Sequence, residues 1–287
     1  MTDKLGIVEF GRQTIQSGDL DPLYIALNRA EMKRSQLAKW MVAYWCLYHA
    51  GAASWLSEQY DAQFWGFIKQ AAANDLGTSP VGKLWPRGKE RRHWRGEAAV
   101  TSAQHMFGRF NDAGTMLNFV INEEPDKLNP NGASPTNLMR RVQTITGFGP
   151  WIAFKVADMV DAADLRNLDF SQAAVFMFEQ PQEAALAVWR QQLGLPDTAR
   201  PRDQAAARDG VVTYLLEQFA DLQCPHKPSR GIRLQEVETV LCKWKSHVNG
   251  HYPIGNDIRE IGDGLEPWTA ESQTASRLLD IFGELHG

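Results

Sequence analysis

Residues 83–96, KLWPRGKERRHWRG, form a short segment rich in basic side chains, here called the basic loop. It contains six lysine and arginine residues and one acid, Glu90, and it is interleaved with Trp85, His93 and Trp94. Planar guanidinium groups pair with phosphate oxygens, and an indole can stack on a base or on the guanidinium itself. The composition therefore predicts an anion site, with a solvated charged surface as the plainer interpretation. The predicted ligands are Arg87, Arg91, Arg92, His93 and Arg95.

A second candidate anion site is the segment TITGFGPWIAFKVADMVD at 144–161, here called the hairpin. A first helix is expected over 137–146, and Gly147 can adopt the positive φ that closes it. Gly149 lets the turn approach another backbone closely, and Pro150 suits the first position of a second helix. Amide N–H groups at such a turn can bind a DNA phosphate. An ordinary helical hairpin fits the same residues.

Asp169 lies twenty-two residues after Gly147, in LRNLDFSQAAVFMF, where another apolar helix is expected to begin. A carboxylate there can act as a general base, as a helix N-cap, or as both. The arrangement resembles that of the helix-hairpin-helix DNA glycosylases, in which a catalytic Asp follows the hairpin. Trp151 stands where the lysine-containing members have their lysine, and Lys155 is one turn further along. The three cysteines exclude the four-cysteine cluster of some members.

Residues 243–257 bring together basic, amide and acidic side chains that are candidates for a substrate pocket. They are Lys243, Lys245, His247, His251, Asn256 and Asp257. A zinc site built from Cys224, His226, Cys242 and His247 is an alternative. However, Cys242 and His247 are five residues apart, which places them about 140° apart around a helix. We therefore expect no metal site.

The secondary structure predicted around these residues is helical. Apolar residues recur at helical spacing in 35–51 and 61–75, with Gly51 as a predicted helix stop, and no succession of alternating strands is present. The predicted fold is all-α, a single glycosylase-like unit over 1–287 with two tentative lobes, 1–125 and 135–287, around a cleft. Further helices are predicted at 97–108, 112–121, 135–146, 150–161, 202–220, 234–247 and 268–283. Loops are predicted at 77–90, 123–135, 194–203 and 224–231.

Composition narrows the class of protein. The 287 residues are 44% hydrophobic and 22% charged with a net charge of −4, so a surface that binds nucleic acid must be local. No apolar run approaches the roughly 20 residues needed to span a bilayer, and the N-terminus lacks the pattern of a signal peptide. The three cysteines are too few and too scattered for a disulfide framework. A reducing cytoplasm is expected, with no membrane association.

Three segments together resemble one particular family, the phage amino acid:DNA transferases, also called α-glutamyl/putrescinyl-thymine pyrophosphorylases. They are RGKERRHWRG (87–96), the hairpin with Asp169, and ETVLCKWKSHVNGHYPIGND (238–257). The similarity extends to DPLYIALNRAE (21–31) and AYWCLYHAG (43–51). The resemblance implies thymine hypermodification in double-stranded DNA, in the cytoplasm of an infected bacterium. The substrate is 5-hydroxymethyluracil that a DNA kinase has pyrophosphorylated, and the nitrogen of an amino acid or polyamine displaces pyrophosphate.

The resemblance also implies roles for the candidate residues. Gly147, Gly149 and Trp151 would grip the DNA backbone while the base leaves the stack. The basic loop would neutralise the departing pyrophosphate, and Asp169 would deprotonate or orient the amine. Lys243, Lys245 and His247 would contact the incoming carboxylate or the pyrophosphate. No cofactor is required, although a divalent cation can accompany the pyrophosphate.

Three other interpretations stay open at this point. A DNA glycosylase shares the hairpin and Asp169 but gives no reason for the basic loop. A non-catalytic helix-hairpin-helix protein would only bind DNA, with strong salt dependence. A metal-dependent enzyme would use the cysteines and histidines.

Overall fold

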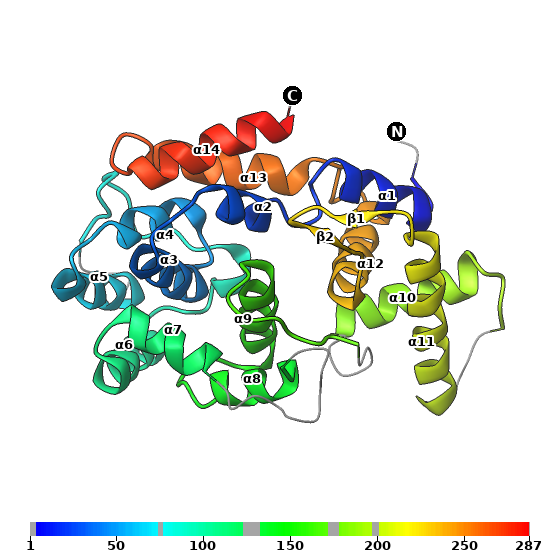
Figure 1. Cartoon of the computed structure of the whole chain (residues 1–287), viewed down its shortest axis with the longest axis horizontal. Helices are drawn as coiled ribbons and strands as arrows, with labels where there is room; N and C mark the ends of the chain where they lie inside the picture. The colour runs from blue at the N-terminus through cyan, green and yellow to red at the C-terminus, as the bar shows by residue number, and fades with distance from the viewer. Residues whose placement is uncertain (1–3, 74–76, 123–132, 172–177, 197–200, 287) are drawn as a thin grey trace. The chain divides into compact units, whose positions relative to one another are not determined.

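Helices make up most of the chain in a computed structural model that describes residues 4–73, 77–122, 133–171, 178–196 and 201–286. Within these residues the sheet structure is one two-stranded antiparallel ribbon, which agrees with the predicted all-α class. The elements in Figure 1 are α1 (Ile7–Gln16), α2 (Pro22–Arg29), α3 (Arg34–Leu47), α4 (Ala50–Ser57), α5 (Asp61–Ala73), η1 (Lys89–Arg91), α6 (Glu97–Phe110), α7 (Ala113–Ile121), α8 (Pro135–Val142), α9 (Pro150–Ala162), α10 (Glu179–Gln191), α11 (Pro201–Gln218), β1 (Gln223–Cys224), β2 (Lys227–Gly231), α12 (Leu234–Val248), α13 (Asn256–Leu265), η3 (Glu266–Trp268) and α14 (Gln273–His286).

The helical period predicts several of these helices, but no helix is predicted over α1, α2, α4, α10 or α13. Helices α6, α7, α9, α11 and α12 agree with their predicted ranges to within a few residues. Helix α8 is shorter than predicted: the amides of Thr144 and Ile145 bond three residues back, to Arg141 and Val142, which tightens the chain into turns before Gly147. The helix predicted at 268–283 is instead the short turn η3 followed by α14.

Two further predictions are wrong. The loop predicted at 224–231 is largely the β1–β2 ribbon, in which Cys224 pairs with Lys227 across a two-residue link. Gly51 does not stop a helix but lies inside α4, where an added Cβ would come 2.4 Å from the carbonyl oxygen of Gly264. Helix α3 ends instead at Leu47, and its C-cap Tyr48 has φ 52°. The glycine serves close packing.

The chain divides into two compact units, each built from two separate segments. Unit 1 comprises residues 1–25 and 169–258, and unit 2 comprises 26–168 and 259–287. The tentative lobe boundary at 125–135 falls inside unit 2, and residues 123–132 lie outside the described part of the chain.

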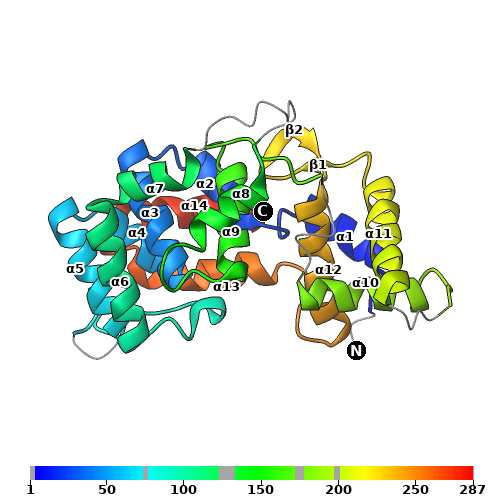
Figure 2. The ribbon, with the colours of Figure 1, turned by 90° about the horizontal axis from the view of Figure 1, so that it is seen from below.

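Unit 2 is a stack of helices around an aromatic core. Helix α3 packs on α4 and α7, α5 packs on α6, α8 packs on α9, and α14 packs on α4 (Figure 2). Trp40, Trp45, Phe64, Phe154 and Trp268 are all fully buried there. Burial of such rings is a major source of stability. This core supports the elements that carry both the basic loop and the hairpin.

Unit 1 is organised around α12, which packs against α1, α10 and α11. Phe10 of α1 and Phe219, just beyond α11, are completely buried, and Trp244 of α12 is 2% exposed. Gly11 allows close contact between α1 and its neighbours, since an added Cβ would lie 2.4 Å from the ring of Phe219. Helix α12 is buried around most of its circumference, including the polar residues Glu236 and Glu238. The carboxyl groups of Glu236 and Glu238 therefore lie inside unit 1 and not on its surface.

The buried side chain of His49 is expected to make the stability of unit 2 depend on pH. Its Nδ1 accepts the amide of Ala52 at the start of α4, and burial lowers the pKa of His49 to about 4 from 6.5. The imidazole of His49 therefore binds a proton more readily in the unfolded chain than in the folded protein. The contribution of His49 to the free energy of unfolding is fully present above pH 6.5 and is lost as the pH falls toward 4. Asparagine retains an acceptor that can cap α4 but does not titrate. We therefore expect the decrease in the free energy of unfolding between neutral pH and pH 5 to be smaller in His49→Asn than in the wild type, by up to about 2 kcal/mol. Urea unfolding at neutral pH and at pH 5 measures this difference, and equal losses in both proteins would contradict it.

Candidate active site and DNA interface

Arg91, in the basic loop, is hydrogen-bonded to the hairpin within unit 2. Its guanidinium is buried, and it donates to the carbonyl oxygens of Gly147 (3.1 Å) and Cys46 (3.3 Å). It also lies over the rings of Trp94 and Phe148, at 5.6 and 5.3 Å from their centroids. Burial lowers the pKa of Arg91. Two segments that the sequence marks separately as anion sites are therefore neighbours.

The turn of the hairpin is anchored from α6. Ser102 donates its hydroxyl to the carbonyl oxygen of Thr146 at 2.5 Å, and the indole N–H of Trp94 lies 3.5 Å from the Ser102 Oγ. Gly147 has φ 83°, and a Cβ added there would lie 2.7 Å from that Oγ. Both backbone conformation and space therefore require glycine at this position.

This requirement predicts a difference between the two hairpin glycines. Gly147→Ala is expected to lower the free energy of unfolding by about 2 kcal/mol or more, because it combines a left-handed residue with displacement of Ser102. Gly149→Ala is the matched control, since Gly149 has φ −77° and a Cβ added there meets nothing within 4 Å. Denaturant unfolding of both variants checks the prediction, and equal destabilisation would contradict it.

Gly149 does not make the close backbone approach expected of it within the described protein. The open space beside it lies at the start of α9, where Pro150 occupies the first helical position as predicted. Trp151 follows, half-buried, with its ring 5.4 Å from that of Tyr48. The amide end of α9 thus has room beside it for an external group such as a phosphate.

The five predicted ligands of the basic loop differ in what their side chains contact. Arg87 donates to the carbonyl oxygens of Trp94 (2.7 Å) and Trp85 (3.1 Å) and also to that of Ala71. Burial, together with the charge of Arg95, lowers the pKa of Arg87 to about 10. Arg87 and Arg91 are therefore engaged with the protein's own backbone, contrary to the expectation that they face an anion. The exposed members of the set are Arg92, His93 and Arg95.

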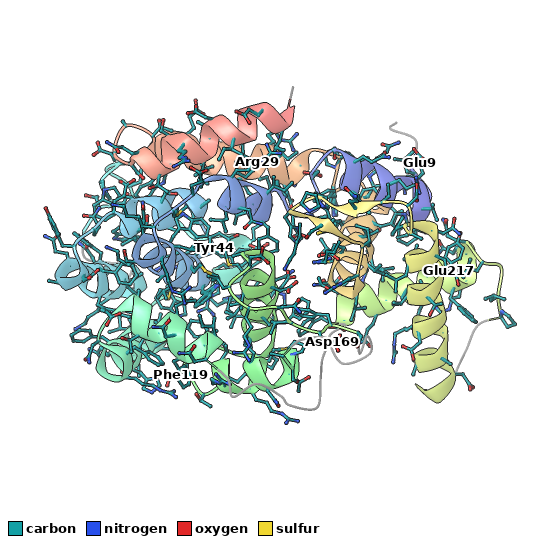
Figure 3. All side chains as sticks on the ribbon, in the orientation of Figure 1. Glu9, Arg29, Tyr44, Phe119, Asp169 and Glu217 are labelled. Atoms are coloured by element: carbon teal, nitrogen blue, oxygen red, sulfur yellow. The ribbon has the colours of Figure 1, made fainter. Side chains whose placement is uncertain are left out.

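Asp169, labelled in Figure 3, is half-buried. Its neighbours in the sequence, Leu168 and Phe170, are buried. The Asp169 Oδ1 accepts the amide of Ser171 at 2.9 Å, a local bond that fixes the carboxylate. Residues 169–171 are not helical, and the apolar helix expected after Asp169 falls on 172–177, outside the described residues. The N-cap role therefore stays a prediction. Asp169 belongs to unit 1 and the hairpin to unit 2.

A buried acid that the sequence does not single out holds the connection before Asp169. Asp161, near the end of α9, has no exposed surface, and its Oδ1 accepts the amide of Leu168 at 3.1 Å. Leu168 also bridges to Ala133. Asp161 follows Asp158 at helical spacing in an apolar helix, so its sequence signal is weak.

In unit 1, two of the C-terminal candidates are bonded inside the protein. Lys243 is buried, pairs with Asp257 at 2.7 Å, and donates to the carbonyl oxygens of Asp19 (2.6 Å) and Leu20. The fully buried Asp19 accepts from the Tyr252 hydroxyl at 2.9 Å and from the amides of Gly255, Asp257 and Ile258 at 2.9–3.1 Å. Burial and the two carboxylates raise the pKa of Tyr252. Lys243 and Asp257 thus stabilise the folded structure of this region. Their charged groups bond to the protein itself and not to an open substrate pocket.

The other candidates are placed in different settings. His247 uses both ring nitrogens, with Nδ1 2.8 Å from the carbonyl oxygen of Tyr252 and Nε2 3.3 Å from the amide of Leu5. Lys245 pairs with Glu183. Asn256 is buried at the start of α13, and His251 is exposed. The structure therefore does not bring the six residues to one pocket.

The alternative zinc set of Cys224, His226, Cys242 and His247 is not assembled, because both ring nitrogens of His247 bond to backbone groups. Cys224 and His226 do lie together, but their companion is Glu236, which the sequence analysis does not single out. Burial raises the pKa of Cys224 to about 12, and burial lowers the pKa of His226 to about 4. Both side chains are therefore neutral near pH 7 in the structure as it stands.

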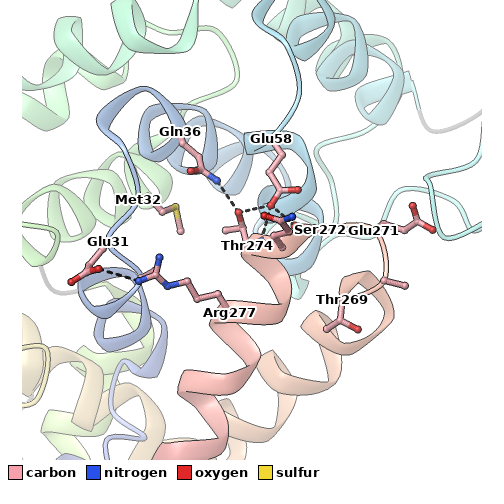
Figure 4. A pocket seen from close by; sticks show the side chains of 12 residues that line it. Glu31, Met32, Gln36, Glu58, Thr269, Glu271, Ser272, Thr274 and Arg277 are labelled. Carbon is pink, nitrogen blue, oxygen red and sulfur yellow. Dashed lines mark hydrogen bonds and ion pairs between the residues drawn. The ribbon is translucent and has the colours of Figure 1, made fainter.

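A cavity of about 610 Å³ lies in unit 2, lined among others by Gln36 of α3, by Glu58 just beyond α4 and by residues at the start of α14. Glu58 accepts from the Thr274 amide and hydroxyl at 2.6 Å, Gln36 donates to the Thr274 hydroxyl at 2.8 Å, and Arg277 pairs with Glu31 at 3.2 Å (Figure 4). Its polar groups thus cap α14 and pair with each other. None of the predicted site residues lines it.

A local cluster of basic side chains beside the amide end of a helix can bind phosphate groups. The family model described as amino acid:DNA transferase matches residues 15–252. The chain is 40% identical to the glycinyltransferase of Pseudomonas phage PaMx11, over 99% of this chain and 98% of that protein. It is 23% identical to the putrescinyltransferase of Delftia phage PhiW-14, over 86% of this chain and 74% of that protein. The chain belongs to the amino acid:DNA transferase family and is a transferase. In the described part of the chain, every helix is too short or too polar to cross a membrane.

Proposed function

We propose that this enzyme transfers glycine onto pyrophosphorylated 5-hydroxymethyluracil in phage DNA. The similarity to a phage glycinyltransferase along the whole chain carries this proposal. The amine nitrogen of glycine attacks the exocyclic methylene carbon, and the bond from that carbon to the pyrophosphate oxygen breaks. Pyrophosphate leaves with the bonding electrons, and the nitrogen loses a proton.

The basic loop supplies charge for the leaving group in this proposal. Arg92, His93 and Arg95 are exposed and follow directly on Arg91, which joins the loop to the hairpin. Negative charge builds up on the pyrophosphate as the carbon–oxygen bond breaks, so fixed cations lower the barrier. Arg87 and Arg91 support the reaction by holding the loop in shape. A divalent cation that enters with the pyrophosphate is compatible with this role, and no other cofactor is invoked.

The hairpin contacts the DNA backbone in the proposal, through the amides around Gly147, Gly149 and Trp151. The open space at Gly149 supports this role, because a phosphate can approach the amide end of α9 there. We infer a helix-hairpin-helix glycosylase-like core, which suits a reaction on a base that has left the duplex stack. The substrate is then double-stranded DNA after the action of a kinase, in the cytoplasm of the infected cell.

Asp169 is the proposed general base. Glycine enters with a protonated amine, and only the unprotonated nitrogen attacks carbon. The local bond from the Ser171 amide orients this half-buried carboxylate. Of the C-terminal candidates, the exposed His251 remains as a contact for the carboxylate of glycine.

The competing function is cleavage of the glycosidic bond, because the hairpin and Asp169 suit that reaction too. Incubating the enzyme with pyrophosphorylated DNA and glycine, and then assaying pyrophosphate and free base in the same sample, separates the two. The proposal predicts pyrophosphate release that depends on glycine, with no free base. Free base with abasic DNA would refute it.

A further inference from the structure

Three side chains of metal-ligand type meet in the interior of unit 1. The Sγ of Cys224 is 3.3 Å from Nε2 of His226 and 3.6 Å from Oε1 of Glu236, and the last two atoms are 3.7 Å apart. Cys224 has no exposed surface, Glu236 is 1% exposed and His226 is 6% exposed. We call these residues the Cys–His–Glu cluster.

The three distances match the edges of a small tetrahedron. Zinc binds sulfur at about 2.3 Å and nitrogen or oxygen at about 2.0–2.2 Å, so tetrahedral ligand atoms lie about 3.3–3.8 Å from each other. We propose that Cys224, His226 and Glu236 bind a zinc ion through Sγ, Nε2 and Oε1, with a water molecule as the fourth ligand. On binding, the thiol proton of Cys224 is released to solvent, and a thiolate–zinc bond forms.

The surroundings of Glu236 suit a metal ligand. Its Oε2 accepts from Nη1 of Arg230 at 2.9 Å and from the amide of Arg233 at 2.8 Å. These bonds fix the carboxylate so that Oε1 faces the cysteine and the histidine, as outer partners commonly do for metal ligands. The Nη2 of Arg230 lies 2.9 Å from Oε1, so an arginine–glutamate pair without metal is the competing interpretation. Zinc would share Oε1 while Arg230 keeps its bond to Oε2.

The inferred ion would have a structural role. Cys224 is in β1, His226 is in the link to β2, and Glu236 is in the first turn of α12. One ion would therefore join the ribbon to the helix around which unit 1 is organised. Since the ligands are buried, substrate does not reach them, and this inference is independent of the proposed transfer reaction.

Metal analysis of the whole protein tests the inference. The purified chain is supplied with zinc, freed of loose metal on a chelating resin, and assayed for zinc by mass spectrometry. We expect stoichiometric zinc in the wild type and in Cys242→Ser, because Cys242 lies outside the cluster. Cys224→Ser and Glu236→Gln are expected to lose most of it. Zinc far below stoichiometry in the wild type would overturn the inference, as would folded Cys224→Ser that retains it in full.

The absorption spectrum of the cobalt-substituted wild-type protein tests the site without relying on a variant that must fold. Replacing zinc with cobalt(II) in the wild type is expected to produce the thiolate-to-cobalt charge-transfer band and the intense visible bands of a tetrahedral site. A cobalt spectrum without the thiolate band, or with the weak bands of an octahedral ion, would show that the cluster is an ion pair and a hydrogen-bonded thiol.

Discussion

Replacing Asp169 with asparagine is expected to lower the rate of transfer by about 10²–10⁴-fold while DNA binding is retained. Asparagine keeps the size of the side chain and an oxygen that can accept the Ser171 amide, but it cannot take a proton from the incoming amine. Single-turnover measurement of pyrophosphate release at saturating glycine isolates this step. The loss should shrink at higher pH, where more of the amine is already unprotonated.

Asp164→Asn is the matched control for this substitution. Asp164 is an exposed acid in the connection after α9, and its φ of 54° is one that asparagine tolerates well. It should transfer glycine at the wild-type rate. If Asp169→Asn is as active as this control, Asp169 serves only as a local backbone acceptor, and the general base lies elsewhere.

Neutralising Arg92 and Arg95 together, with glutamine at both positions, is expected to lower kcat/KM for pyrophosphorylated DNA by about 10²-fold or more. Each substitution removes a positive charge that would stabilise the departing pyrophosphate. The loss of one well-placed hydrogen-bond donor typically lowers the rate of such a reaction by about 10²–10³-fold. Both side chains are exposed, so the fold should be unaffected. A weaker dependence of binding on salt is expected as well, since fewer phosphate contacts release fewer counterions.

Lys89→Gln provides the comparison within the same loop. Lys89 is exposed but pairs with Glu260 at 3.0 Å, so its charge is already partly balanced. We expect less than about a threefold change in kcat/KM for it, as for most exposed ion pairs. Equal kcat/KM for the double variant and Lys89→Gln would mean that the basic loop is a solvated surface, as the plainer interpretation of the sequence holds.

The sequence predicts several long helices, such as α9 and α12, because their apolar period is local, but it predicts no helix over α10. It misses α13, whose start at Asn256 depends on bonds from Asp19 to the amides of Asp257 and Ile258. These partners are more than 230 residues apart in the chain, so no window of sequence contains the signal. The β1–β2 ribbon is missed for a different reason, since a strand of two residues has no detectable alternation.

The candidate site was predictable in residue type but not in orientation. The arginine density of the basic loop marks it as a site, but it does not distinguish the buried Arg91 from the exposed Arg92 beside it. Only the position of the hairpin decides this, because Gly147 offers Arg91 a carbonyl oxygen. In the same way, the structure places His226 beside Cys224 and Glu236 and not with His247. Glu236 is in α12, which follows a ribbon that the sequence does not predict.

Isotope-labelled glycine tests the central claim most directly. The wild-type enzyme is incubated with duplex DNA that contains pyrophosphorylated 5-hydroxymethyluracil and with a pool of amino acids and putrescine in which only glycine carries the label. The DNA is then digested to nucleosides for mass spectrometry. We expect a labelled thymidine derivative with glycine bonded through nitrogen, formed in equal amount to the pyrophosphate released. Unlabelled adducts would contradict glycine as the donor, and unchanged nucleosides or abasic sites would contradict transfer itself.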